Sequence, residues 1–372
     1  MTKIKIAVVF GGRSGEHEVS LRSAASIMET LDRKRYEILP VGITREGTWI
    51  AGGNSWGVLS KNETPEDCFR ATLVTDPTCP GFFLWAGRDD GEKYDIQSFR
   101  KVDVVFPVLH GPYGEDGAIQ GLLEMAGLPY VGCGVMSSAV GMDKAVMKEL
   151  FVQHGLPVGR YLYFGQRDWL ADRNAWVSRV EAEIGYPCFV KPANLGSSVG
   201  ISKAYSDEEL VRGTEEAFAY DEKAIVEAFI PGREIECSVL GDWEVRASLP
   251  GEIIPNHDFY DYRTKYIDDH SELIIPVRLE EALIEEVQEL AIRSFKAIDG
   301  SGMARADFFV DTENRNIFIN EINTIPGFTS ISMYPKLWEV SGLSYRELIE
   351  ELIQIAMQRN ERRKRLSNLP PI

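Results

Sequence analysis

The sequence predicts an α/β protein whose N-terminal part is a doubly wound domain with a parallel sheet. Residues 4–10 and 102–109 are apolar runs typical of strands buried on both faces. Each run leads into a glycine-containing loop and then into a helical pattern, at about 20–31 with Ser20 as the expected N-cap, and at 118–126. This alternation indicates parallel strands covered by helices. The chain of 372 residues is long enough for two or three domains.

The two loops carry ionisable residues that point to a ligand site. Glu16 lies in the first loop, and His110 and Glu115 lie in the second. Loops at the carboxyl ends of parallel strands share one edge of the sheet, where such folds bind ligands. A nicotinamide site is disfavoured, because the first loop lacks the G-x-G-x-x-G spacing and no acidic residue ends the next strand. A purely structural role for His110 stays open at this point.

The composition restricts the function classes. Hydrophobic residues make up 44% and charged residues 26% of the chain, which is ordinary for a globular protein. The formal net charge of −17 argues against a nucleic-acid or anionic-membrane binder. No run of about 18 apolar residues is present, and the N-terminus leads directly into a strand pattern. The five cysteines show no metal-type spacing. We therefore expect a cytoplasmic protein with reduced thiols.

The middle of the chain predicts a phosphate-binding segment. Residues 137–154 and 173–184 have helical patterns, and the strand that follows carries Lys191. A loop of small residues with Ser197 and Ser198 comes next, and its backbone N–H groups and hydroxyls suit a phosphate. An ordinary hairpin with an exposed lysine is the alternative. The strands expected at 224–230 and 233–240 offer a backbone edge, at 227–230, to an adenine ring.

The C-terminal part predicts a metal site on a hairpin. Strand alternation places Arg305 and Asp307 on one face, and Glu321 and Asn323 on one face of the returning strand. Oxygen ligands of this kind suit Mg²⁺. A solvated hairpin face with a surface ion pair is the alternative. A Pro-Gly turn follows, ending at Gly327, whose backbone N–H groups can face an anion.

Three further segments complete the C-terminal part. Residues 251–275 have polar and aromatic residues without a core pattern, which favours a lid, and 279–298 has the pattern of an amphipathic helix. A last helix, about 345–365, ends in a run of cations that includes Arg359 and is expected to be a solvated helix end rather than a nucleic-acid tail. Residues 49–100 lack clear periodicity and are expected to form loops and short strands.

Seven motifs follow one another along almost the whole chain: FGGRSGEHEVS at 10–20, HGPYGEDG at 110–117, MDK at 142–144, KPANLGSSVG at 191–200, YRTKY at 262–266, RAD at 305–307 and NEINTIPG at 320–327. Together, and in this order, they resemble the D-alanine–D-alanine ligases. The stretch 49–100 departs from the shorter members of that family, whereas longer members carry a comparable insertion.

The resemblance implies an ATP-grasp fold with three domains. These are an N-terminal substrate-binding domain over 1–136, a small lid domain over 137–224, and a C-terminal mixed-sheet domain over 225–372 that includes an ω-like loop at 251–275. ATP is expected between the latter two. The implied activity joins two D-alanine molecules at the expense of ATP, through an acyl phosphate, for peptidoglycan precursors and hence cell wall biogenesis and cell shape. A D-alanine–D-serine or D-alanine–D-lactate ligase, and a non-catalytic nucleotide-binding module, are the alternatives.

By the same resemblance, the nucleotide is bound by Lys144, Lys191, Ser198, Glu227, Phe229, Ile230 and Glu234. Two Mg²⁺ ions, which Mn²⁺ can replace, are held by Asp307, Glu321 and Asn323. The catalytic set is Glu16, Ser197, Tyr266, Arg305 and Gly327, and the remaining substrate contacts are His110, Lys265, Ser332 and Met333. D-Alanine and ATP are the expected small-molecule partners, and a homodimer is the expected assembly.

The preferred second substrate follows from two residues. Members of the family that use D-lactate have a histidine where this chain has Tyr266, and those that prefer D-serine have a polar or basic residue where it has Met333. We therefore expect D-alanine to be preferred, with some use of D-serine because a methyl-sized pocket discriminates weakly against an added hydroxyl.

Overall fold

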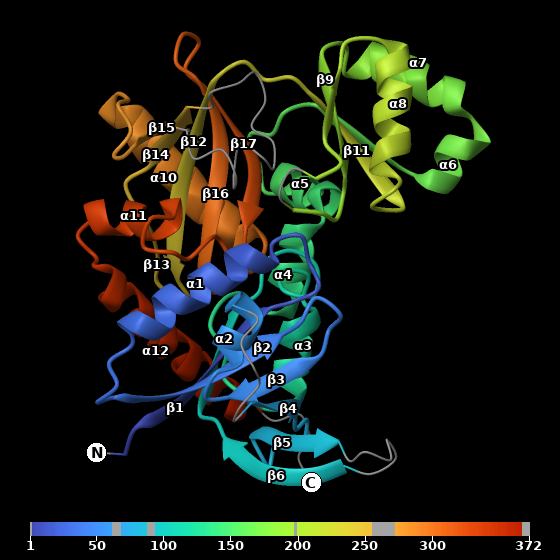
Figure 1. Ribbon diagram of the computed structural model, residues 1–372. Helices are drawn as coiled ribbons and strands as arrows, with labels where there is room; N and C mark the ends of the chain where they lie inside the picture. Colours follow the sequence, from blue (N-terminus) through green and yellow to red (C-terminus); the bar gives the residue numbers. More distant parts are fainter. Residues whose placement is uncertain (1, 62–67, 88–93, 197–198, 255–271, 367–372) are drawn as a thin grey trace, which may run out of the picture.

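Three β-sheets with their covering helices make up the computed structural model, which describes residues 2–61, 68–87, 94–196, 199–254 and 272–366 (Figure 1). In chain order these are a seven-stranded, a four-stranded and a six-stranded sheet. The first lies at the bottom of Figure 1, and the other two lie side by side above it. The expected α/β architecture is confirmed.

The seven-stranded sheet is parallel only over three strands. They are β1 (Ile4–Gly11), β2 (Tyr36–Ile43) and β7 (Val104–Val108), with β1 in the middle. Ile6 and Val8 of β1 pack into one hydrophobic cluster, and Ala7 and Val9 pack into another on the opposite face. This two-sided burial explains the uninterrupted apolar run of β1.

Residues 49–100 extend this sheet by antiparallel pairing, so the doubly wound domain has a mixed sheet. The elements of this extension are β3 (Trp49–Gly52), α2 (Ser55–Lys61), β4 (Cys68–Leu73), β5 (Gly81–Gly87) and β6 (Tyr94–Lys101). The mostly exposed strand β6 and a β-bulge between Leu84 and Trp85 weaken the alternation that would have predicted these strands.

Helix α1 (His17–Thr30) begins three residues before the predicted N-cap at Ser20. Ser20 is instead buried in the first turns, where its hydroxyl donates to the carbonyl of Val108 and accepts from the backbone N–H of Gly11. Ser20 thus bonds the helix to two strands and does not cap its N-terminus. Helix α3 (Ala118–Met125) follows the second loop, as expected.

The helix expected over 137–154 is two helices, α4 (Val135–Met142) and α5 (Lys144–Gln153). The break falls at Asp143, whose extended backbone leaves the helical region and whose carboxylate accepts hydrogen bonds from the N–H groups of Ala145 and Val146. An aspartate at this position is a strong N-cap, and it was missed because apolar periodicity continues across the break.

The four-stranded sheet is formed by β8 (Tyr161–Gly165), β9 (Cys188–Pro192), β10 (Ser202–Ala204) and β11 (Lys223–Ala228), in the order β10-β9-β11-β8. Its helices are α6 (Gln166–Ala171), α7 (Arg173–Glu183) and α8 (Asp207–Ala217). One apolar cluster fills the space between this sheet and its helices.

The third sheet contains the hairpin that was predicted to bind metal. Its strands are β12 (Arg233–Gly241), β13 (Val245–Ala247), β14 (Gly251–Ile254), β15 (Glu272–Ile274), β16 (Gly302–Asp311) and β17 (Asn316–Asn323). Its helices are α10 (Glu281–Ala297), α11 (Met333–Val340) and α12 (Tyr345–Lys364). The two ends of the predicted lid, 251–275, are strands, and 255–271 lie outside the described residues.

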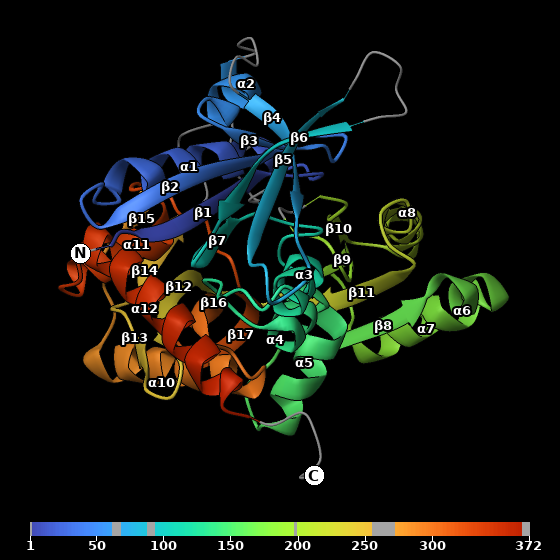
Figure 2. The ribbon, with the colours of Figure 1, turned by 90° about the horizontal axis from the view of Figure 1, so that it is seen from below.

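Helix α12 connects the first and third sheets (Figure 2). Leu352 and Ile353 of this helix share a hydrophobic cluster with Phe106 of β7 and with Phe328 of the loop after β17. The rings of Phe106 and Phe328 lie edge to face with their centroids 5.7 Å apart. The cation run that was expected to be solvated is only partly so, because Arg359 is buried.

The predicted domain limits at 136 and 224 fall within α4 and β11. We propose limits at 134 and 228 instead, so that no helix or strand is divided. In the part of the chain that the structure describes, no helix is both long enough and apolar enough to cross a membrane.

Candidate active site

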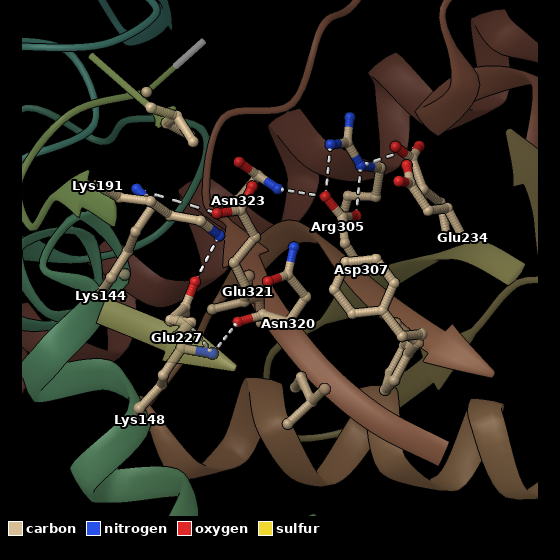
Figure 3. A pocket seen from close by; sticks show the side chains of 18 of the residues that line it. Lys144, Lys148, Lys191, Glu227, Glu234, Arg305, Asp307, Asn320, Glu321 and Asn323 are labelled. Atoms are coloured by element: carbon tan, nitrogen blue, oxygen red, sulfur yellow. Dashed lines mark hydrogen bonds and ion pairs between the residues drawn. The ribbon is translucent and has the colours of Figure 1, made fainter. Parts of the chain in front are cut away.

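The hairpin of β16 and β17 brings the predicted metal ligands together. Arg305 pairs with Asn323, and Asp307 pairs with Glu321, across the two strands. Asn320 is the extra residue of a β-bulge that follows this pair, because the register resumes at Phe308 and Ile319. The Asn323 amide donates to the Asp307 carboxylate over 2.9 Å. The predicted convergence is therefore confirmed for these side chains (Figure 3).

Arg305 makes a two-pronged ion pair with Asp307. Its Nε and one terminal nitrogen each lie 2.7 Å from an Asp307 carboxylate oxygen. Glu236, from the neighbouring strand β12, lies 3.0 Å from the same Nε. Burial alone would lower the pKa of Arg305, but the attraction of Asp307 and Glu236 outweighs it and raises the pKa well above its ordinary value. Arg305 is thus a permanent cation in the cavity.

A buried cluster of one carboxylate and two lysines lies on the other side of Asn320. Glu227 of β11 is 2.7 Å from Lys148 and 2.5 Å from Lys191. Lys148 also donates to the carbonyl of Asn320, the bulge residue, over 2.9 Å. Burial would raise the pKa of Glu227, but the two lysines lower it to about 2. Lys148 was missed, although its place four residues after Lys144 on a helix was a usable signal.

Lys144 joins this cluster from the first turn of α5. Its Nζ donates to the carbonyl of Leu195 over 2.6 Å and lies 3.9 Å from a Glu321 oxygen. Burial lowers the pKa of Lys144, and the attraction of Glu321 only partly offsets this. In Figure 3, Lys144 and Lys191 approach Glu321 and Glu227 from one side, and Arg305 and Asp307 lie beyond Asn323.

The two N-terminal loops bring together Glu16 and His110, which are buried, and Glu115, which is half-buried. Burial, and then the charge of Glu16, raise the pKa of Glu115 to about 8. Burial lowers the pKa of His110, although Glu16 opposes this shift. The sequence placed these residues at one edge of the sheet, and the structure confirms that prediction. The sequence alone, however, did not assign a role to Glu115.

A cavity of about 280 Å³ connects the three groups of residues. It is bordered by residues of the second and third sheets, and by residues of the segments that follow β1 and β7. The predicted site residues that line it are Glu16, His110, Lys144, Lys191, Glu227, Phe229, Ile230, Glu234, Arg305, Asp307, Glu321, Asn323 and Gly327. Phe189 and Phe229 border its end near β11 with their ring centroids 6.3 Å apart. Aromatic rings of this kind pack favourably against a planar apolar group.

Two of the predicted site residues that the structure describes do not line this cavity. Ser332 and Met333, at the start of α11, are absent from its lining as far as the chain is described. The hydroxyl of Ser332 bonds to Thr329, and Met333 is buried against Ile253 and Leu337. The expected apolar wall by Met333 is therefore not seen. Four further predicted residues lie outside the described residues: Ser197, Ser198, Lys265 and Tyr266.

The hairpin residues have the ligand chemistry of a Mg²⁺ site. Asp307 and Glu321 are opposed carboxylates, and Asn323 adds an amide oxygen, which together are the hard oxygen ligands that Mg²⁺ takes. No cluster of three or more His, Cys, Asp or Glu side chains suited to a metal is found among the described residues, so the set depends on the amide. One Asp307 oxygen accepts from Arg305 and Asn323 and the other from Arg305, which leaves the second oxygen a lone pair for an ion.

Family models match both halves of the chain. Residues 5–133 match the model described as D-ala D-ala ligase N-terminus, and residues 150–354 match D-ala D-ala ligase C-terminus. The two matches leave out only the region around α4 and the two ends of the chain.

Individual relatives agree with these matches. A D-alanine–D-alanine ligase of Heliobacterium modesticaldum is 53% identical over 98% of both chains, and that of Caldicellulosiruptor bescii is 50% identical over 98% of both. Among solved structures, the D-alanine–D-alanine ligase of Coxiella burnetii has a TM-score of 0.82 at 38% identity, covering 98% of this chain and 97% of the other. A D-Ala:D-Ser ligase of Enterococcus faecalis has a TM-score of 0.85 at 37% identity, covering 95% and 100%. The chain that forms this cavity, with its acidic hairpin and its lysines, is therefore a member of the D-alanine–D-alanine ligase family.

Proposed function

We propose that this protein joins two D-alanine molecules to D-alanyl-D-alanine, with conversion of ATP to ADP and phosphate, for peptidoglycan precursors. The observation that best supports this proposal is that Lys144 and Lys191 share one cavity with the Asp307–Glu321 hairpin. Glu16 borders the other end of the same cavity. This arrangement provides cations for a polyphosphate, ligands for a metal and a carboxylate for an ammonium group in one space. The reaction itself is inferred from membership of the family.

The chemistry requires activation of one D-alanine carboxylate, which is a poor electrophile. Its oxygen attacks the γ-phosphorus of ATP, ADP leaves, and an acyl phosphate forms. The amine of the second D-alanine then attacks the acyl carbon, and phosphate leaves from the tetrahedral intermediate. Both steps bring negative groups together or create an oxyanion, so fixed cations and N–H donors are the main contribution of the protein.

The roles that the family resemblance implies agree with the positions of these residues in the cavity. Lys144 and Lys191 hold the phosphates, and Glu227, Phe229, Ile230 and Glu234 surround the adenosine. Asp307, Glu321 and Asn323 hold Mg²⁺, or Mn²⁺ in its place, which when bound neutralises charge on the phosphates. Arg305 is a cation beside this hairpin, and with the N–H of Gly327 it stabilises the oxyanion.

Substrate recognition is proposed to begin at Glu16, which accepts the ammonium group of the first D-alanine. Ser197 and Tyr266 orient Glu16, Ser198 covers the phosphates, and Lys265 and Ser332 bind the carboxylate of the second D-alanine. These roles come from the family resemblance. Ser332 lies beside Gly327, which borders the cavity, and its hydroxyl is bonded to Thr329.

The alternatives are less well supported. The curated relatives cited above are D-alanine–D-alanine ligases, and Asp307, Glu321 and Arg305 are all in place for catalysis, which disfavours a non-catalytic module. The similarity to a D-Ala:D-Ser ligase keeps D-serine as a competing second substrate that an assay must include. We further propose a cytoplasmic homodimer, as expected from composition and resemblance.

Phosphate release with ATP and Mg²⁺, measured against a panel of D- and L-amino acids and D-lactate, tests the proposal. D-Alanine should stimulate release and yield the dipeptide, with little depsipeptide at neutral pH. A protein that hydrolyses ATP without regard to D-alanine, or that yields depsipeptide as its main product, would be a different enzyme.

A further inference from the structure

The loop that carries Gly327 is held by side chains of the N-terminal domain. It runs from Ile325 through Pro326 and Gly327 to Phe328, an irregular four-residue segment, called the turn below, that begins two residues after β17. Here the Ile325 carbonyl accepts from His110 Nδ1 over 2.9 Å, and the Phe328 N–H donates to Ser23 Oγ over 3.2 Å. Each of the two turn groups thus bonds to the N-terminal domain.

The two side chains are themselves connected. A carbonyl oxygen can only accept, so His110 carries its proton on Nδ1, and the lowered pKa of His110 favours this neutral form. Its Nε2 is then an acceptor that lies 3.5 Å from Ser23 Oγ, a long contact. Ser23 can give its proton to His110 while it accepts from Phe328. The pair His110–Ser23 therefore bridges the turn from its first residue to its fourth.

Glu115 holds the same turn at a second point. One carboxylate oxygen accepts from the backbone N–H of Ile325 over 3.2 Å, and the other accepts from the N–H of Gly111 over 2.7 Å. Both backbone groups of Ile325 are therefore bound by the second N-terminal loop. Since Phe328 is also packed in the core shared with Phe106, both ends of the turn are fixed.

We propose that Ser23, His110 and Glu115 are positioning residues that hold the Gly327 N–H at the oxyanion site. This inference rests on the proposed function, because it concerns the geometry of that reaction. None of the three acts through its own contact with the reacting atoms. Each acts through the backbone of the Ile325–Phe328 turn, whose Gly327 borders the cavity between two fixed ends. Oxyanion donors stabilise a transition state only when they are held in place beforehand.

Ser23→Ala is the sharpest test, because α1 provides a matched control. Ser20 and Ser23 are both fully buried serines on this helix, and each bonds to backbone groups. Ser20 bonds to β1 and β7, whereas Ser23 bonds to the turn. Ser20→Ala should lower thermal stability about as much as Ser23→Ala but leave kcat within about twofold, since its partners lie outside the catalytic turn.

Three quantities are measured for each variant: kcat for dipeptide formation, KM for ATP, and affinity for a phosphinate dipeptide that mimics the tetrahedral intermediate. A misplacement of about 1 Å costs roughly 100-fold, so Ser23→Ala should lower kcat roughly 10- to 100-fold. The phosphinate affinity should fall by a similar factor, and KM for ATP should stay unchanged. A merely structural role would lower stability without this selective loss of analogue affinity.

A second pair of variants keeps the inference testable if Ser23→Ala folds poorly. Glu115→Gln places an amide where two N–H groups need acceptors, and it should reproduce the loss of kcat and analogue affinity. Asp116→Asn is its control, because Asp116 accepts from Tyr113 and Ala118 within its own segment. Equal kcat values in each variant and its control would overturn this inference but would leave the proposed function standing. A wild-type protein that forms no dipeptide would overturn the proposed function and this inference with it.

Discussion

At the scale of single residues, Arg305 is the group whose loss should affect catalysis most. Arg305→Ala should lower kcat by roughly 10²- to 10³-fold, the usual cost of one oxyanion donor. It also leaves the half-buried carboxylate of Asp307 and the buried carboxylate of Glu236 without their shared cation. Steady-state kinetics of the purified variant measures the effect, with Arg305→Lys as a comparison that retains charge but loses the two-pronged contact. A kcat near that of the wild type would remove Arg305 from the mechanism.

Glu227 gives a residue-scale prediction about pH. Its folded-state pKa of about 2 lies below the ordinary value of 4.5, so its ion pairs stabilise the fold above that value. The contribution is lost as pH falls from about 5 toward 2, because the folded protein must then also take up the proton. Urea unfolding of wild type and Glu227→Gln at pH 7 and at pH 3 should show a stability difference that shrinks at the lower pH. A constant difference would contradict the ion-pair assignment of Glu227 with Lys148 and Lys191.

At the scale of elements, the β16–β17 hairpin should act as the metal-binding unit. Glu321→Gln removes one of two opposed carboxylates without changing strand pairing, so it should raise the Mg²⁺ concentration needed for half-maximal turnover and leave the unfolding transition in place. Turnover measured across a Mg²⁺ titration, beside circular dichroism, tests both parts. Turnover like that of the wild type at low Mg²⁺ would show that Glu321 is not a ligand.

The end of α12 yields a prediction about stability rather than activity. Arg359 is buried and donates to the carbonyls of Gly132 and Tyr130, over 2.7 and 2.9 Å. Arg359→Ala leaves both acceptors without this donor, so it should lower the free energy of unfolding by about 2–3 kcal/mol. Arg365→Ala, at an exposed position of the same run, should change it by less than about 0.5 kcal/mol. Equal effects in denaturant titrations would mean that the buried contacts of Arg359 contribute little.

At the scale of the whole molecule, local patterns predicted the elements but not every neighbour. Strand alternation brought Asp307 and Glu321 together because their pairing is set within one hairpin. Glu236 and Lys148 were missed, because they reach the site through the pairing of β12 with β16 and the packing of α5 on the bulge at Asn320. The long-range pairing of Glu236 leaves no periodic signal in the sequence, whereas the spacing of Lys148 from Lys144 indicates only a shared helix face. The break at Asp143 was missed for the opposite reason, since a local cap lies inside a continuing apolar pattern.

Residues of the second and third sheets share one cavity with the two N-terminal loops. Lys144 of α5 lies at the end of the cavity proposed to hold the nucleotide, whereas Glu16 lies in the first N-terminal loop. A non-hydrolysable ATP analogue at 100 times its Kd should stabilise the folded protein by about 2.7 kcal/mol and raise Tm. Lys144→Met should reduce this rise strongly, because a phosphate contact is lost, whereas Glu16→Gln should retain it and lose only the additional shift produced by D-alanine. Differential scanning calorimetry with each ligand alone and with both measures these shifts. If Glu16→Gln abolishes the nucleotide shift as well, the two ends of the cavity do not bind their ligands separately, and the assignment of Glu16 to the amino acid alone is wrong.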